Sequence, residues 1–344
     1  MRPVPQLPAT VIPCALVDTE DTAFVQALTG LRLPHLARLL ATARVQRSPA
    51  HPPQRLSTVH EWAQAQAWGW TAPDGLLPWA AWHARERGLD AHGKQAWAVL
   101  TLCHWHVVQG QVSLEPPASL AVSEAETEAL RQAMQIYCTQ DGITLHPFAP
   151  GQWLAASELF RQLPSASVDR AVGQSVPAWW VGTGQSTPSA AAQHLRRLQN
   201  EMQMLFYTHP CNETRAMPIN SFWVSGTGDL AAASATAPDT AIQPPGQSAA
   251  LAQAPLVGTA QPAWLHPAVQ RLQQAAQQRH VPAWVDAWHA VDAQVLASLD
   301  AAQSPALVLC GARQSSVVQC QPKGWQTWWR TWRAPALTQA LLEQ

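Results

Sequence analysis

The sequence has 344 residues, of which 12% are charged, and its formal net charge is −1. This length suits one large α/β domain or two domains of moderate size. The near-zero charge supplies no basic face, which excludes a general nucleic-acid-binding protein. The 18 Trp, against 5 Phe and 2 Tyr, predict that indole rings fill much of the interior or cover an interface.

The cysteines and the N-terminus indicate the cellular compartment. The cysteines form neither a C-x-x-C pair nor a dense framework, which favours reduced thiols in the cytoplasm. The first apolar run is short and broken by proline, so we expect no signal peptide. No window of about 18 uninterrupted apolar residues occurs, so no membrane span is expected.

The first third of the chain alternates strand and helix patterns. Thr10–Val17 is a short apolar run that predicts a buried strand. Thr22–Ala43 has helical spacing with a break, which predicts two helices. Ser57–His92 is rich in tryptophan and helical in composition. Gly93–Val108 predicts a core strand that ends near its last residue.

The middle of the chain contains the clearest helix signals. Ser123 and Glu126 have the spacing of a capping box, which predicts a helix from Ser123 to Tyr137. Asp141-Gly142 predicts a turn before a further strand. Glu158–Gly173 is amphipathic and ends in glycine, as helices often do. Ala192–Phe206 carries an apolar face at helical spacing.

The last third begins with a change of composition. Leu230–Ala263 consists mainly of Ala, Pro, Gln, Ser and Gly, which predicts a linker or mobile loop. Trp264–Leu299 is again helical in pattern, Ser304–Gln314 predicts a final strand, and Gly324–Gln344 a terminal helix pair. Alternating strands and helices predict an α/β fold. We expect residues 1–229 to form the main part of one domain, which residues 264–344 complete.

The stretch PINSFWVSGTGDLAAA resembles a phosphate-binding loop. Gly226, Gly228 and Ala231 fit the G-x-G-x-x-G/A pattern of dinucleotide sites. Such a site also needs an acidic residue about 20 positions further on, in a parallel crossover. No Asp or Glu occurs between Asp239 and Asp286. A strand followed by a tight turn is therefore favoured over a dinucleotide loop.

Two further patterns each leave two interpretations open. His104 and His106 lie two residues apart, so on a strand they share one face and could begin a zinc site. No third ligand stands at a telling spacing, so a core-edge strand with a solvated histidine is favoured. The four tryptophans of Trp325–Trp332 lie on one helical face beside basic residues. They predict either a partner-binding helix or a helix packed on the protein's own sheet.

Three stretches carry a resemblance to a known family: Leu100–Val107, Trp153–Gly173 and, most specifically, Leu195–Gly228. Together they resemble the RpfE-type regulatory proteins. That family is similar to the cofactor-independent phosphoglycerate mutases of the alkaline phosphatase superfamily. The resemblance implies an alkaline-phosphatase-like central sheet flanked by helices, with the Pro/Ala-rich stretch as an irregular insertion.

Individual residues match or miss the mutase motifs. The mutase segment N-x-x-W-x-x-G-x-G is matched by Asn220, Trp223, Gly226 and Gly228. Leu33–Leu40 resembles a diverged form of another mutase segment. The mutases hold two metal ions with Asp and His, using D-G-x-G-D and D-H-G segments.

The corresponding stretches here depart from that pattern. ALVDTED keeps Asp18 and Asp21 without the glycine, and LVLCGARQ lacks the Asp-His pair. The resemblance therefore implies the fold and not the mutase mechanism. We expect no cofactor. The alternative is a divalent metal such as Mn or Zn, with Asp18, Asp21, His104 and His106 as candidate ligands.

Three functions follow as hypotheses. The favoured one is a non-catalytic or regulatory mutase-like protein that binds a small phosphorylated or anionic ligand, or a protein partner through the Trp325–Trp332 helix. The others are an active phosphoglycerate mutase or phosphatase with diverged ligands, and a tryptophan-rich assembly scaffold. The expected ligand site is a cleft after SFWV, lined by residues of one chain segment: Asn220, Trp223, Gly226, Gly228 and His209.

Overall fold

The computed structural model describes residues 9–183, 188–235, 262–299, 306–320 and 337–343. Contacts divide the chain into two compact units. Unit 1 comprises Met1–Pro53, Val59–Trp70 and Asp239–Gln344; unit 2 comprises Gln54–Thr58 and Thr71–Pro238. We expected one domain, but only part of the N-terminal half joins the C-terminal strands. Both units combine helices with sheets, so the mixed α/β class is confirmed.

Unit 1 is built on a four-stranded sheet of order β1-β10-β11-β3. Its strands are β1 (Thr10–Ile12), β10 (Ala306–Cys310), β11 (Ser315–Cys320) and β3 (Ala43–Arg47). β1 runs parallel to β10, and the other neighbours are antiparallel. The strand expected in Thr10–Val17 is confirmed but is shorter. The strand expected in Ser304–Gln314 is confirmed as β10, but it is not the final one, because β11 follows it. β2 (Val17–Asp18) pairs separately, in parallel, with β12 (Leu342–Glu343).

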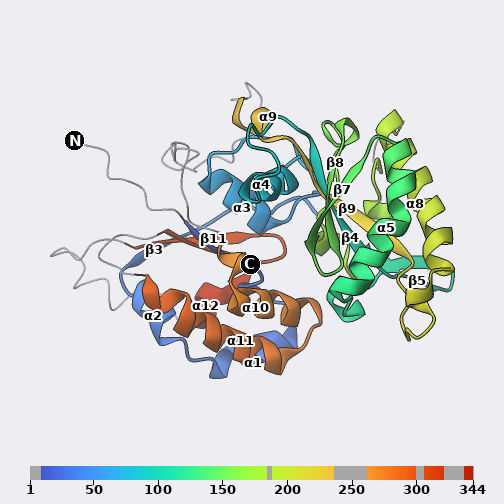
Figure 1. The fold of residues 1–344 in the computed structure, drawn as a ribbon. Helices are drawn as coiled ribbons and strands as arrows, with labels where there is room; N and C mark the ends of the chain where they lie inside the picture. The colour runs from blue at the N-terminus through green and yellow to red at the C-terminus, as the bar shows by residue number, and fades with distance from the viewer. Residues whose placement is uncertain (1–8, 184–187, 236–261, 300–305, 321–336, 344) are drawn as a thin grey trace. The chain divides into compact units, whose positions relative to one another are not determined.

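Helices cover both faces of this sheet because its strands alternate apolar side chains. Ile12 and Leu309 belong to the larger core, whereas Val11 and Val308 belong to a smaller one that includes Val59. The smaller core lies under α3 (Val59–Ala67). Figure 1 shows the helices of the larger core together: α1 (Thr22–Gly30), α2 (Pro34–Leu40), α10 (Pro267–Gln277), α11 (Val281–Gln294) and α12 (Leu337–Leu341).

Unit 2 is built on an all-antiparallel sheet of order β7-β8-β4-β9. The strands are β7 (Thr144–Ala149), β8 (Gln152–Ala156), β4 (Trp97–Cys103) and β9 (Ser221–Gly228). The single central sheet that we expected is therefore replaced, within the described residues, by two four-stranded sheets. The short connection between β7 and β8 allows only antiparallel pairing, which explains this pair of strands.

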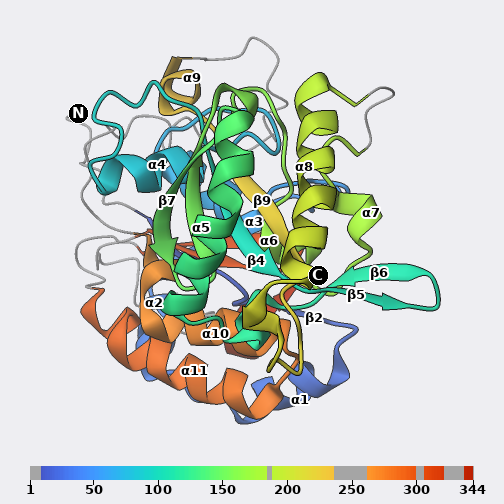
Figure 2. The ribbon, with the colours of Figure 1, turned by 45° about the vertical axis from the view of Figure 1, so that its right-hand side comes forward.

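Two long helices lie side by side on one face of this sheet (Figures 1 and 2). They are α5 (Glu124–Gln140) and α8 (Ala190–Tyr207), and both contribute to one core with the sheet. α4 (Trp79–Glu86) packs against β4 and β9 from the other face. Every residue of β4 is buried, as a strand covered on both faces requires. The helix predicted at Ala192–Phe206 is confirmed.

Short elements complete the described chain. β5 (Trp105–Val108) and β6 (Gln111–Leu114) form a hairpin. α9 (Leu230–Ala235) begins the stretch predicted as a linker, of which residues 236–261 lie outside the described ranges, as does the Trp325–Trp332 stripe. The remaining short helices are η1 (Pro117–Leu120), η2 (Glu158–Phe160), α6 (Val168–Ala171), α7 (Val176–Trp179), η3 (Pro210–Asn212), η4 (Ala263–Leu265) and η5 (Leu296–Ser298).

Local predictions succeed or fail for identifiable reasons. The capping box is confirmed: Ser123 N–H donates to Glu126 Oε2 at 2.8 Å, and Glu126 N–H donates to Ser123 Oγ at 3.2 Å. The amphipathic stretch Glu158–Gly173 is not one helix, because Pro164 separates η2 from α6. Across the described ranges, we find no helix with the length and apolarity needed to cross a bilayer.

Candidate functional site

Asn220, the central residue of the expected ligand site, bridges the backbone of Trp105 in unit 2. Its Oδ1 accepts a hydrogen bond from Trp105 N–H at 2.7 Å, and its Nδ2 donates to Trp105 O at 2.9 Å. Its own N–H donates to Cys103 O at 3.2 Å. The side-chain amide therefore acts as a strand neighbour where β4 passes into β5. This contact also explains why the strand predicted to run to Val108 breaks at His104.

The other residues of the matched motif pack inside unit 2. Trp223 is 2% exposed, and its Nε1 donates to Ala166 O at 2.9 Å. Gly226 and Gly228 do not form a turn after the strand; they lie within β9 with φ of 64° and 124°. The pairing with β4 shifts register there, as at a β-bulge.

The bulge glycines allow a close approach of the backbone that precedes and begins α4. A Cβ at Gly226 would lie 3.2 Å from Ala80 N, and one at Gly228 would lie 3.3 Å from Leu76 O. Both glycines also have φ values that other residues rarely adopt. Close packing and a positive φ therefore explain why both positions are glycine.

His209 and Asn220 share the loop between α8 and β9, which is tied down by side-chain hydrogen bonds. His209 Nδ1 accepts from Cys211 N–H at 3.2 Å and so caps η3. Asn212 Nδ2 donates to Phe206 O at 2.7 Å and Ile219 O at 2.8 Å, which closes the loop. The loop is a fixed element of unit 2.

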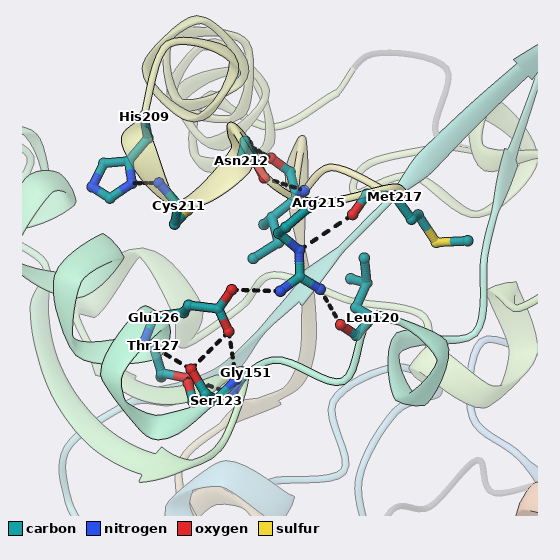
Figure 3. Close-up of polar contacts among 11 residues, drawn as sticks. Leu120, Ser123, Glu126, Thr127, Gly151, His209, Cys211, Asn212, Arg215 and Met217 are labelled. Atoms are coloured by element: carbon teal, nitrogen blue, oxygen red, sulfur yellow. Dashed lines mark hydrogen bonds and ion pairs between the residues drawn. The ribbon is translucent and has the colours of Figure 1, made fainter.

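Arg215 joins this loop to the start of α5. Figure 3 shows its guanidinium between the Glu126 carboxylate and Leu120 O, with Nε donating to Met217 O at 3.3 Å. Burial alone would raise the pKa of Glu126, but hydrogen bonds from Ser123 and Arg215 outweigh it and lower the pKa. The carboxylate that begins α5 therefore stays charged and paired.

The candidate metal ligands belong to different units. His104 Nδ1 lies 2.8 Å from Pro218 O, and its ring centroid is 5.9 Å from that of His106 in unit 2. Asp18 and Asp21 belong to unit 1, where Asp18 accepts from Glu20 N–H and Asp21 pairs with Arg279 at 2.8 Å. Within the described ranges, no three His, Cys, Asp or Glu side chains are placed to share a metal ion.

Asp229 follows the bulge and is compensated within unit 2. Its carboxylate is 4% exposed, and Oδ2 lies 2.8 Å from Arg161 Nη1. Oδ1 accepts from Ala232 N–H at 2.8 Å, at the start of α9. The negative charge that follows β9 is therefore compensated by an ion pair with Arg161.

A polar group that sequence reasoning missed lies in unit 1, at the carboxyl end of β10. Glu343 is 3% exposed, and its Oε1 accepts from Arg313 N–H at 2.6 Å and Gln314 N–H at 2.5 Å. Its Oε2 is buried and has no hydrogen-bond partner among the described residues. A Cβ at Gly311 would lie 2.8 Å from Oε1. We call Gly311 and the amides of Arg313 and Gln314 the carboxylate cradle.

The cradle lies beside the end of β1. Because β1 and β10 are parallel, their carboxyl ends meet at one edge of the sheet, and Ala15 N–H donates to Cys310 O at 2.7 Å. Burial, together with the nearby Cys14 and Glu343, raises the pKa of the Cys310 thiol. Cys310 is therefore a neutral neighbour of the cradle and not a thiolate nucleophile.

Successive backbone amides that converge on one oxygen form an anion-binding concavity. Two adjacent N–H groups do this for Glu343 Oε1, and Gly311 leaves the space that the oxygen occupies. The signal in the sequence was the glycine directly after a buried strand in LVLCGARQ. The acidic partner, Glu343, lies 30 residues after Arg313 and 29 after Gln314, so spacing alone could not pair it with this loop.

Comparisons with known proteins include two distant structural neighbours. No family model and no curated protein matches the chain. The structure is similar to the PH0037 protein from Pyrococcus horikoshii, with a TM-score of 0.47 and 12% identity over 91% of this chain and 86% of that one. It is also similar to a cofactor-independent phosphoglycerate mutase from Thermoplasma acidophilum DSM 1728, with a TM-score of 0.35 and 11% identity over 92% and 89%. Both TM-scores are below 0.5, so neither neighbour supports a function for this chain.

Proposed function

We propose that this chain is a regulatory, RpfE-like relative of the mutases that binds a small anionic molecule at the carboxylate cradle and does not transfer a phosphoryl group. One observation carries the proposal. The amides of Arg313 and Gln314 both donate to a single buried carboxylate oxygen at the carboxyl end of β10. Ligands of open α/β sheets bind beyond the carboxyl ends of strands.

The physical chemistry of the cradle favours an anion. Backbone amides carry partial positive charge, and their interaction with an anion is stronger where water is excluded. The cradle excludes water, since Glu343, whose carboxylate occupies it, is 3% exposed. Gly311 admits the oxygen to a position that a side chain would block. These features together form a small, preorganised anion site.

The neighbouring side chains favour binding without phosphoryl transfer. Phosphoryl transfer with two metals needs several carboxylates and imidazoles that converge on the ions. The residues that end β10 and follow β1 here are Cys310 and Cys14. Asp21, a retained carboxylate, is paired with Arg279. This edge of the sheet thus carries thiols, and one of the two retained acidic residues is held in an ion pair.

Amide chemical shifts of the isotope-labelled protein test the binding site. Titration with acetate and with inorganic phosphate should move the signals of Arg313 and Gln314. Gly311→Ala should weaken this response, because its Cβ occupies the oxygen position. Gly30→Ala is the matched control, since a Cβ there meets nothing within 4 Å. Responses confined to residues of unit 2 would instead favour the site after β9.

Activity and metal content test the absence of mutase chemistry. We expect purified protein to interconvert no 2- and 3-phosphoglycerate and to carry no stoichiometric Mn or Zn. Turnover that requires about two equivalents of metal and is lost in Asp18→Ala would favour the active mutase instead.

A further inference from the structure

We propose that Glu343 is a built-in competitor of the cradle's ligand, and that this ligand is a small aliphatic carboxylate. The inference rests on the proposed function and adds both the ligand class and its regulation. The C-terminal segment Leu337–Glu343, which forms α12 and β12, presents a carboxylate on a short aliphatic stem to the cradle. A free ligand can enter only when this side chain leaves.

The segment is held in unit 1 by core packing and by specific contacts: Ala340 and Leu341 belong to the larger core, and Leu337 and Leu342 pack against it. Leu341 is fully buried, and Arg47 Nη2 donates to Gln339 O at 2.8 Å. β12 contributes only two residues to its pairing with β2, Leu342 with Val17 and Glu343 with Asp18. The helix before it has five residues. So short a unit can open locally at a fraction of the free energy of global unfolding.

The Glu343 carboxylate binds the cradle through one of its two oxygens. Oε1 accepts two amide hydrogen bonds, whereas Oε2 is buried and meets no partner in the part of the chain that the structure describes. A buried polar atom without a partner costs free energy relative to its state in water. A purely structural cap would gain by satisfying both oxygens. The unpartnered Oε2 therefore lowers the free energy needed to exchange Glu343 for another carboxylate.

The surroundings favour a carboxylate over a phosphate. The cradle supplies two amide donors, which serve one oxygen, whereas phosphate presents several charged oxygens. Asp18 lies opposite Glu343 in the register of β2 and β12, so a dianion would meet a negative charge on the neighbouring strand. A monoanion of acetate size matches the donor number and the charge.

Tethering makes Glu343 an effective competitor. A group held by a short tether acts at an effective concentration in the millimolar range. Acetate should therefore bind the native protein weakly. Removal of the carboxylate should raise the apparent affinity by the inverse of the fraction of time that the cradle is free of Glu343, a factor that we expect to be about tenfold or more.

The experiment compares four proteins by the amide shifts of Arg313 and Gln314 during titration with sodium acetate, and separately with sodium phosphate. Glu343→Ala should bind acetate about tenfold more tightly than native protein. Glu343→Gln should be intermediate, since its amide oxygen can still accept both N–H groups without charge. Glu20→Ala, which removes an exposed glutamate of the same unit, should match the native protein.

The outcomes separate this inference from the proposed function. Equal acetate affinity in native protein and Glu343→Ala would overturn the competition and leave the anion site standing. No shift in a folded Glu343→Ala would overturn both. Tighter binding of phosphate than acetate would overturn the ligand class. If Glu343→Ala fails to fold, Glu343→Gln decides the competition by the same comparison with native protein.

Discussion

Asn220 holds Trp105 by both of its backbone polar groups, with Oδ1 accepting at 2.7 Å and Nδ2 donating at 2.9 Å. The two residues are 115 positions apart in the sequence. The contact fixes the start of the β5–β6 hairpin beside the start of β9. The residue that the sequence motif placed in a ligand site is therefore a bridge between two backbone segments.

We predict that Asn220→Ala lowers the free energy of unfolding by about 2 kcal/mol, since two hydrogen bonds of about 1 kcal/mol each are lost. Asn220→Asp should cost less, because the acceptor remains. Urea denaturation measures both. Asn200→Ala, an exposed asparagine on α8, should stay within about 0.5 kcal/mol of native protein. If Asn220→Ala leaves the stability unchanged but abolishes anion binding, Asn220 belongs to a ligand site instead.

Asp292 caps a helix from far away in the sequence. Its Oδ1 accepts from Leu36 N–H at 2.8 Å and its Oδ2 from His35 N–H at 3.1 Å, at the start of α2. The carboxylate is 2% exposed. We expect Asp292→Ala to lower the free energy of unfolding by about 3 kcal/mol, and Asp292→Asn by less. Asp286→Ala, at an exposed position of the same helix, is the control; equal effects would exclude the capping role.

Cap and contact pairs show how far the sequence could predict this structure. The Ser123–Glu126 box was predictable because both partners lie within one helical turn. Asp292 with Leu36, and Asn220 with Trp105, are long-range pairs with no local pattern. Gly226 and Gly228 indicated an unusual backbone conformation in the sequence. Their packing against the start of α4 is a tertiary contact that the sequence pattern could not predict. Strand pairing is equally non-local, so two sheets could not be distinguished from one.

Acid should destabilise the protein through a buried histidine. Burial lowers the pKa of His60 to about 3 from 6.5. Between these values the unfolded chain binds a proton that the folded state does not. Stability should therefore fall as the pH drops below about 6.5, by up to about 1.4 kcal/mol per pH unit for this group. His60→Gln should flatten the profile from pH 6.5 to 4, whereas exposed His289→Gln should leave it unchanged. An identical slope in His60→Gln would refute the assignment.

Most of the cysteine thiols should be unreactive toward a thiol reagent in the folded protein. Burial raises the pKa of Cys138, with help from Asp141, to about 12. Cys103, Cys310 and Cys320 are buried as well, while Cys14 and Cys211 are half-buried. A thiol reagent should therefore modify at most these last two rapidly in native protein, and all six after denaturation. Rapid native modification of more than two would contradict the burial pattern.

The central claim is that the amides of Arg313 and Gln314 form an anion site at the end of β10. Acetate titration of Glu343→Ala, followed by the amide signals of these two residues, tests it most directly. We predict a saturable shift of both signals, which Gly311→Ala in the same background weakens and Gly30→Ala does not. Two unmoved signals in a protein that retains its native spectrum would contradict the claim.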